Sequence, residues 1–216
     1  MEAYVFDFDG LILDTEWSAY HSIVEEFAAF GLEFDLVSWQ RCVGAGWSVA
    51  WLDELESRCG EPIDRDVVLA RRQARKLELL AQCDVLPGVV ERIDEACAHG
   101  LGLAVASSSP RDWVESHLDR LGLLHRFDAV LTRDDVERTK PAPDLYLAAA
   151  GALDVAPQRS VAFEDSHNGS VAAKAAGMWC VVVPNAITRD QDFSHADLLV
   201  TSLEEVGLPA LRRLLP

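Results

Sequence analysis

Residues 3–16 read Ala-Tyr-Val-Phe-Asp-Phe-Asp-Gly-Leu-Ile-Leu-Asp-Thr-Glu, and this stretch decides the fold. Its apolar beginning predicts a buried strand over residues 3–8. Asp7 and Asp9 stand at the carboxyl end of that strand, where the alternation of strand side chains starts both on one face. Two like charges there cost free energy unless a cation or a proton compensates, so we expect a Mg²⁺ ion at this point.

Outward from this stretch, short apolar runs alternate with segments of helical periodicity. This pattern predicts an α/β fold with a doubly wound, Rossmann-like parallel sheet. In such a sheet the chain lays strands outward on one side and then crosses to the other, which makes the first and fourth strands neighbours. The further predicted strands cover residues 101–106, 129–131, 160–163, 179–183 and 198–200.

The first two predicted strands are separated by far more residues than the dozen or so that a single crossover helix requires. We therefore predict an inserted α-helical cap domain over residues 15–83, with the catalytic core formed by residues 1–14 and 84–216. The start of the insertion carries an apolar stripe at helical spacing, formed by Ala19, Ile23, Val24, Phe27 and Phe30.

Three other strand ends carry polar residues. Glu164-Asp165 follows the fourth predicted strand, Ser107-Ser108-Ser109 follows the second, and Lys140 follows the third. Hydroxyl groups and backbone N–H groups can hold phosphoryl oxygens, and a lysine supplies the positive charge that the acidic residues lack. The ends of these strands meet at one edge of the sheet, so the sequence predicts a site for phosphate chemistry there.

Taken together, these motifs resemble those of the haloacid dehalogenase-like hydrolases, in the branch of small phosphatases and β-phosphoglucomutases with a helical cap. The matching positions are Asp7, Asp9, Gly10, Asp14, Thr15, Ser107, Lys140, Glu164 and Asp165.

The resemblance implies a Mg²⁺-dependent phosphatase. Asp7 would attack phosphorus to give an aspartyl phosphate, and Asp9 would serve as general acid and base. Ser107 and Lys140 would bind the transferring phosphoryl group. The Mg²⁺ ion would be held by Asp7, the Asp9 main-chain carbonyl, Asp165, and Glu164 directly or through water.

Substrate contacts are expected mainly from the cap, where the same resemblance points to the segment around Gly44 and Gly46. Trp47 is either a substrate contact or part of the cap core. The basic run Arg71, Arg72, Arg75 and Lys76 is either a solvated helix face or the source of one cation for a distal group of the substrate. The predicted substrate-binding set is Ser108, Gly44, Gly46, Trp47, Glu16 and Arg72.

The composition limits the partners. Nineteen Lys and Arg against 36 Asp and Glu give a formal net charge of −17, which repels nucleic acids and acidic membrane surfaces. The five scattered cysteines contain no Cys-x-x-Cys pair, and no apolar stretch approaches the roughly 20 residues of a membrane span. We expect a cytoplasmic protein, monomeric or weakly dimeric, whose partner is a small phosphorylated metabolite.

Two alternatives remain beside the phosphatase. A β-phosphoglucomutase shares the core motifs, but that subgroup carries a His where this chain has Ala19 and an Arg that aligns with Trp47. A non-catalytic binding protein on the same fold would be expected to lack one of the charged positions, and none is missing. Sugar phosphates are the first expectation for the substrate, with phosphorylated sugar acids, phosphoglycolate and mononucleotides still open.

Overall fold

The computed structural model describes residues 1–42, 50–60 and 62–214. The described residues form two compact units. One unit combines Met1–Leu13 with Asp84–Pro216, and the other is Asp14–Cys83. We call them the core unit and the helical unit. Asp14 belongs to the helical unit, one residue before the insertion predicted from the sequence.

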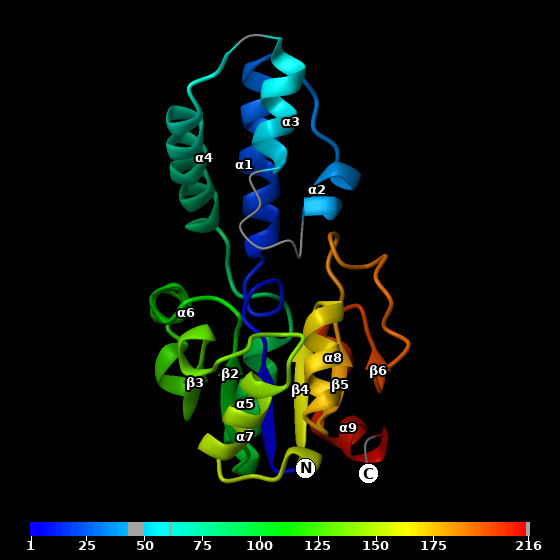
Figure 1. Cartoon of the computed structure of the whole chain (residues 1–216). Coiled ribbons are helices and arrows are strands. Elements are labelled where there is room, and N and C mark those ends of the chain that lie inside the picture. The colour runs from blue at the N-terminus through cyan, green and yellow to red at the C-terminus, as the bar shows by residue number, and fades with distance from the viewer. Residues whose placement is uncertain (43–49, 61, 215–216) are drawn as a thin grey trace. The chain divides into compact units, whose positions relative to one another are not determined.

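Within its described residues, the core unit holds a six-stranded parallel sheet of order β3-β2-β1-β4-β5-β6 (Figure 1). The first strand thus lies between the second and the fourth, with Val5 opposite Ala104 on one side and Ala162 on the other. The doubly wound α/β fold is confirmed. The strands are β1 (Ala3–Phe6), β2 (Gly102–Ala106), β3 (Ala129–Leu131), β4 (Ser160–Glu164), β5 (Trp179–Val182) and β6 (Leu198–Leu199).

The first strand ends two residues earlier than the predicted range of 3–8. The Asp7 N–H still donates to Phe163 O at 2.9 Å, but Phe8 O accepts from the N–H of Ile12 at 3.0 Å and so closes a turn. Gly10 has a φ of +86°, a conformation that glycine adopts without a steric penalty. This turn releases Asp7 and Asp9 from the sheet at its carboxyl edge.

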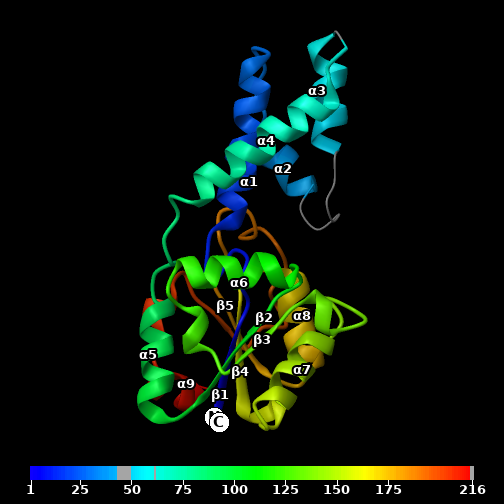
Figure 2. The same ribbon diagram turned by 90° about the vertical axis from the view of Figure 1, so that its left-hand side faces the viewer.

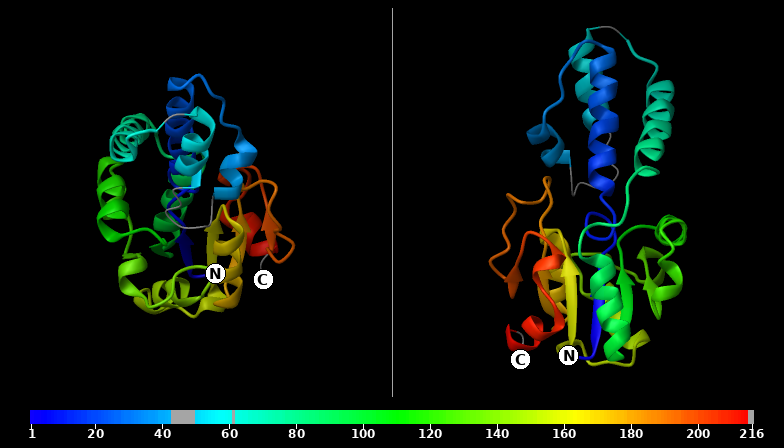
Figure 3. Two further views of the ribbon diagram at one scale, coloured as in Figure 1. Left: turned by 45° about the horizontal axis from the view of Figure 1, so that its top comes forward. Right: turned by 180° about the vertical axis from the view of Figure 1, so that it is seen from behind.

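Helices cover both faces of the sheet, with α7 and α8 on one side and α5 and α9 on the other (Figures 2 and 3). The α7 and α8 side is lined by small residues such as Ala104, Ala162 and Ala172, which let these helices approach closely. Larger rings fill the opposite side, where Tyr4 and Phe163 meet edge to face at 5.0 Å. The helices are α5 (Val89–His99), α6 (Arg111–Arg120), α7 (Asp144–Ala152), α8 (His167–Ala175) and α9 (Leu208–Leu214).

The helical unit contains α1 (Thr15–Ala29), α2 (Leu36–Cys42), α3 (Ala50–Cys59) and α4 (Arg65–Leu80), and α4 packs against α1. Asp14 caps α1 by accepting from the N–H of Trp17 at 2.9 Å, which satisfies one of the open donors of the first turn. Of the predicted apolar stripe, Ala19, Ile23 and Phe27 are buried, whereas Val24 and Phe30 are half-buried.

Short 3₁₀ turns complete the connections of the core unit, at Leu124–Arg126, Arg133–Asp135, Pro157–Arg159 and Leu203–Glu205. Across residues 1–42, 50–60 and 62–214, every helix is too short or too polar to cross the hydrocarbon layer of a membrane.

Candidate active site

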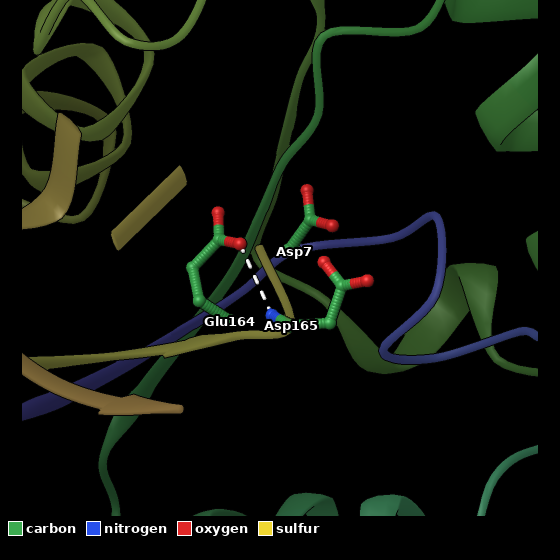
Figure 4. Close-up of side chains that lie close together, drawn as sticks. All are labelled: Asp7, Glu164 and Asp165. Carbon is green, nitrogen blue, oxygen red and sulfur yellow. Dashed lines mark hydrogen bonds between the residues drawn. The ribbon is translucent and has the colours of Figure 1, made fainter. Parts of the chain in front are cut away.

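Asp7, Glu164 and Asp165 form a buried acidic cluster at the carboxyl edge of the sheet (Figure 4). Asp7 follows β1, Glu164 ends β4, and Asp165 comes directly after it. One carboxylate oxygen from each residue lies within 4.8 Å of the others, and Asp7 is 6% exposed and Glu164 fully buried. Three carboxylates gathered out of water require compensation by cations or protons.

Lys140 supplies part of that compensation. Its ammonium group, 6% exposed, donates to Asp7 Oδ1 and, at 2.6 Å, to Glu164 Oε1. Within this described cluster, one ammonium and three carboxylates leave two negative charges when all are ionised. A divalent cation would balance them, and carboxylate oxygens are the ligands that Mg²⁺ prefers. The donor set therefore fits the metal that the sequence predicted, which the Asp7, Glu164 and Asp165 side chains would hold.

Glu164 is held in place at both of its oxygens. Its Oε1 accepts from the buried Tyr146 hydroxyl as well as from Lys140, and its Oε2 accepts from the N–H of Asp165 at 3.1 Å and the Ser166 hydroxyl at 3.2 Å. Gly169, in the first turn of α8, makes room for this carboxylate, because a Cβ at that position would overlap its oxygens. The first turn of α8 and the Glu164 carboxylate therefore lie in direct contact.

Asp165 is oriented by a residue from the segment after β5. Asn185 donates from Nδ2 to Asp165 Oδ2 at 2.7 Å, and its own Oδ1 accepts from the N–H groups of Ile187 and Thr188. Gly10 passes directly over the Asp165 carboxylate, where a Cβ would collide with Oδ2. The β1 turn and the β5 segment thus fix Asp165 from two sides.

Burial shapes the protonation of this cluster. It raises the pKa of Asp7 to about 8, with further upward contributions from Glu164 and Asp9, while Lys140 acts in the opposite direction. For Lys140, burial alone would lower the pKa, but Asp7 and Glu164 outweigh it and raise the pKa above its usual value. The pKa of Tyr146 is raised by burial first and by Glu164 second, so its hydroxyl stays a donor.

Asp9 points to a second set of partners on the β2 side. Its Oδ2 accepts from the Ser109 hydroxyl at 2.6 Å and from the Ser107 hydroxyl at 3.4 Å, and its Oδ1 accepts from the Trp113 indole N–H at 3.0 Å. Ser107 is buried, whereas Ser108 is exposed at the sheet edge. The core therefore brings together the predicted residues Asp7, Asp9, Ser107, Lys140, Glu164 and Asp165.

The predicted substrate contacts of the cap are only partly described. Gly44, Gly46 and Trp47 lie outside the described residues. Glu16 is half-buried in the first turn of α1, in the helical unit.

The basic residues of α4 differ in their partners. Arg71 pairs with Glu26, and Arg75 pairs with Glu25 and Glu78. Arg72 forms no ion pair within 4.0 Å with any described residue; its guanidinium lies 6.0 Å from the Trp51 ring centre, and its Nε lacks a hydrogen-bond partner among them. Burial lowers the pKa of Arg72 despite the nearby Glu16 and Glu26.

Three residues of the site escaped the sequence analysis: Trp113, Tyr146 and Asn185. Ser109 belongs to the predicted Ser107-Ser108-Ser109 run, but as a candidate for phosphate and not as a partner of Asp9. Trp113 follows that run closely, so a search for donors near Ser107 could have found it. Tyr146 lies six residues after Lys140, in the first turn of α7. Asn185 carries no local signal, because only the packing of the segment after β5 against Gly10 brings it to Asp165.

Comparison with known proteins identifies the family. A model of the haloacid dehalogenase-like hydrolase family matches residues 4–183. YhcW of Bacillus subtilis, named for an inferred phosphatase activity, is 39% identical over 98% of this chain and 96% of its own length. Hexitol phosphatase B of Escherichia coli is 31% identical over 94% of this chain and 93% of its own.

Solved structures agree with this result. CbbY from Rhodobacter sphaeroides, in a complex with xylulose-(1,5)bisphosphate, is 32% identical with a TM-score of 0.76 and covers 98% of this chain and 99% of its own. A Thermotoga maritima protein assigned by name to the β-phosphoglucomutases is 27% identical with a TM-score of 0.81, over 99% of both chains. The prediction of a hydrolase, from a group whose named relatives are phosphatases, is confirmed. The chain belongs to the haloacid dehalogenase-like hydrolase family.

Proposed function

We propose that the protein is a Mg²⁺-dependent phosphatase that hydrolyses a sugar phosphate through an aspartyl phosphate on Asp7. The observation that carries the proposal is the contact of the buried Lys140 ammonium with Asp7 beside two further carboxylates. These groups would supply a nucleophilic oxygen, a fixed cation and a site for a divalent cation at one point, which supports the proposal. In-line phosphoryl transfer requires all three.

The metal site is assigned to the side chains of Asp7, Glu164 and Asp165 and to the main-chain carbonyl of Asp9. When bound, Mg²⁺ supplies positive charge that neutralises the oxygens of the transferring phosphoryl group. Tyr146 and Asn185 support two of the ligands, because they donate to Glu164 and Asp165 respectively. Such outer contacts hold metal ligands in a productive orientation.

In the first step, an Asp7 carboxylate oxygen attacks phosphorus, and the bond between phosphorus and the ester oxygen breaks. Lys140 holds Asp7 Oδ1, and no described residue donates a hydrogen bond to Oδ2, so this oxygen remains available as the nucleophile. Asp9 gives its proton to the departing alkoxide and is then a carboxylate. Lys140 and Ser107 bind the phosphoryl oxygens during this transfer.

In the second step, Asp9 accepts a proton from water as the water oxygen attacks phosphorus. The bond between phosphorus and Asp7 breaks, and inorganic phosphate and the Asp7 carboxylate are released. Asp9 ends the cycle protonated, as it began. One carboxyl group therefore serves both steps in turn.

The class of substrate follows from the relatives. Hexitol phosphatase B is named for a phosphorylated sugar alcohol, and CbbY was crystallised with a phosphorylated ketose. Both support a sugar phosphate for this chain. We assign Arg72, the α4 arginine without a carboxylate partner among the described residues, to contact the polar part of the substrate away from the reacting phosphate. Glu16, Ser108 and the segment with Gly44, Gly46 and Trp47 stay proposed as further contacts.

The test is release of inorganic phosphate from a panel of sugar phosphates, phosphorylated sugar acids, phosphoglycolate and nucleotides, with Mg²⁺ and with EDTA. We expect release from one sugar phosphate above the others, loss of release in EDTA, and no turnover by a folded Asp7→Asn variant. Activity retained by Asp7→Asn would refute the nucleophile assignment. Full activity in EDTA would refute the metal.

The mutase alternative has one specific observation in its favour, the structural likeness to the Thermotoga maritima protein. Against it, Ala19 is buried in α1 and offers no proton-transferring group where the mutases carry a His. Incubation with β-glucose 1-phosphate separates the two activities. Net phosphate release supports the phosphatase, whereas accumulation of glucose 6-phosphate without release would establish a mutase.

A further inference from the structure

The Asp9 carboxylate is clamped by donors that the assigned chemistry does not use. Trp113 Nε1 donates to one oxygen at 3.0 Å and the Ser109 hydroxyl donates to the other at 2.6 Å. Trp113 lies in the first turn of α6 and Ser109 in the loop before it, so both belong to the core unit, as Asp9 does. Both oxygens of the Asp9 carboxylate therefore accept hydrogen bonds, which restrict its rotation.

The indole of Trp113 is itself held firmly. Its backbone N–H donates to Pro110 O at 3.1 Å as α6 begins, and its ring meets the His117 ring edge to face at 4.4 Å between centres. An aromatic side chain has two rotatable bonds, so these contacts leave the N–H direction nearly fixed. A fixed donor can set the direction of the carboxylate that it contacts, whereas a mobile hydroxyl would follow it.

We propose that Trp113 is a positioning residue that aims Asp9 at the leaving-group oxygen, with Ser109 as the second support. This inference rests on the proposed phosphatase function and adds a residue to it. General acid catalysis requires the proton to be delivered along the breaking bond, and a donor misplaced by one ångström loses much of its effect. Trp113 touches no reacting atom and acts only through Asp9.

The consequence depends on the leaving group. p-Nitrophenolate departs without a proton, so hydrolysis of p-nitrophenyl phosphate needs little help from Asp9 in the first step. Phenolate from phenyl phosphate is a more basic leaving group and gains more from protonation. Removing the indole N–H should therefore slow the second substrate selectively, because kcat/KM reports only the steps up to leaving-group release.

The experiment compares kcat/KM for the two esters in wild type, Trp113→Phe and Ser109→Ala, with Mg²⁺ present. Trp113→Phe keeps the ring against His117 and removes the donor. We expect about a tenfold loss with phenyl phosphate and less than about a twofold loss with p-nitrophenyl phosphate. Trp179→Phe, on β5 beside Lys174, is the matched control and should change neither value.

A purely structural role for Trp113 would lower both values equally, and that result would overturn the proposal. A second test uses the Asp9→Asn background, where Trp113→Phe should cause no further loss with phenyl phosphate. A full additive loss there would also overturn it. The proposed function fails separately, if Asp7→Asn hydrolyses p-nitrophenyl phosphate as fast as the wild type does.

Discussion

Asp7 combines burial with a role as a metal ligand, and this links metal binding to pH. Burial raises its pKa to about 8, while Mg²⁺ binds only the carboxylate. Below about pH 8 the ion must displace a proton. We therefore expect the apparent Mg²⁺ affinity to fall about tenfold for each pH unit between about pH 8 and pH 6. Calorimetric titration at three pH values measures this slope.

The raised pKa of Asp7 also makes the folding stability of the metal-free protein depend on pH. Because the folded pKa lies above the unfolded value, the proton on Asp7 favours the metal-free folded state at low pH, and this contribution is lost as the pH rises through about 8. Asp7→Asn is the control. It should remove the contribution of Asp7 to the pH dependence of Mg²⁺ affinity and to the pH dependence of folding stability. Equal Mg²⁺ affinity of the wild type at pH 6 and pH 8 would contradict the assignment.

Helix α8 offers a test at the scale of one element. Gly169 in its first turn leaves no room for a Cβ beside Glu164, whereas Gly151 in α7 faces open space. Gly169→Ala should lower the free energy of unfolding by about 1–3 kcal/mol and weaken Mg²⁺ binding, because Glu164 must move. Gly151→Ala should be neutral or stabilising by up to about 1 kcal/mol.

Thermal melts with and without Mg²⁺ measure both variants. The decisive quantity is the additional stability that Mg²⁺ provides, which Gly151→Ala should retain in full. Equal Mg²⁺ stabilisation of the two variants would show that α8 does not position Glu164 for the metal.

Helix α4 carries both an arginine with a structural role and an arginine proposed to contact the substrate, so the two can be compared. Arg75 has carboxylate partners, and Arg72 has none among the described residues. Arg72→Met keeps an unbranched apolar side chain at this position and removes the guanidinium that lies over the Trp51 ring. We expect KM for the preferred sugar phosphate to rise about tenfold with little change in kcat, and Arg75→Met to leave both unchanged. Equal effects of the two variants on KM would contradict the assignment of Arg72.

The elements of the core could be predicted because each one leaves a local pattern. The apolar runs of β1, β2, β4 and β5 are long enough to be read, and doubly wound topology alone places β1 beside β4. From that strand order the sequence predicted that the acidic and basic residues at the strand ends meet at one site. Tyr146 and Asn185 could not be assigned in this way, because their contacts with Glu164 and Asp165 depend on helix rotation and loop packing that no residue spacing records.

At the scale of the whole molecule, the net charge of −17 opposes the approach of an anionic substrate. Raising the salt concentration from about 0.01 M to about 0.1 M shortens the screening length from about 30 Å to about 10 Å. At saturating Mg²⁺, we expect KM for the sugar phosphate to fall by about two- to threefold and kcat to stay constant. A KM that rises with salt would show that local cations govern substrate capture.

The central position of β1 also bears on synthesis of the chain. Its neighbours β2 and β4 begin at Gly102 and Ser160, so the ribosome must add well over a hundred residues before the strand is flanked on both sides. At roughly 5–20 residues per second this takes about 10 to 30 s. The helical unit, Asp14–Cys83, is contiguous and can complete its own contacts first. During that interval we expect the apolar segment Ala3–Phe6, which is buried in the folded protein, to be available for binding by chaperones that act on nascent chains.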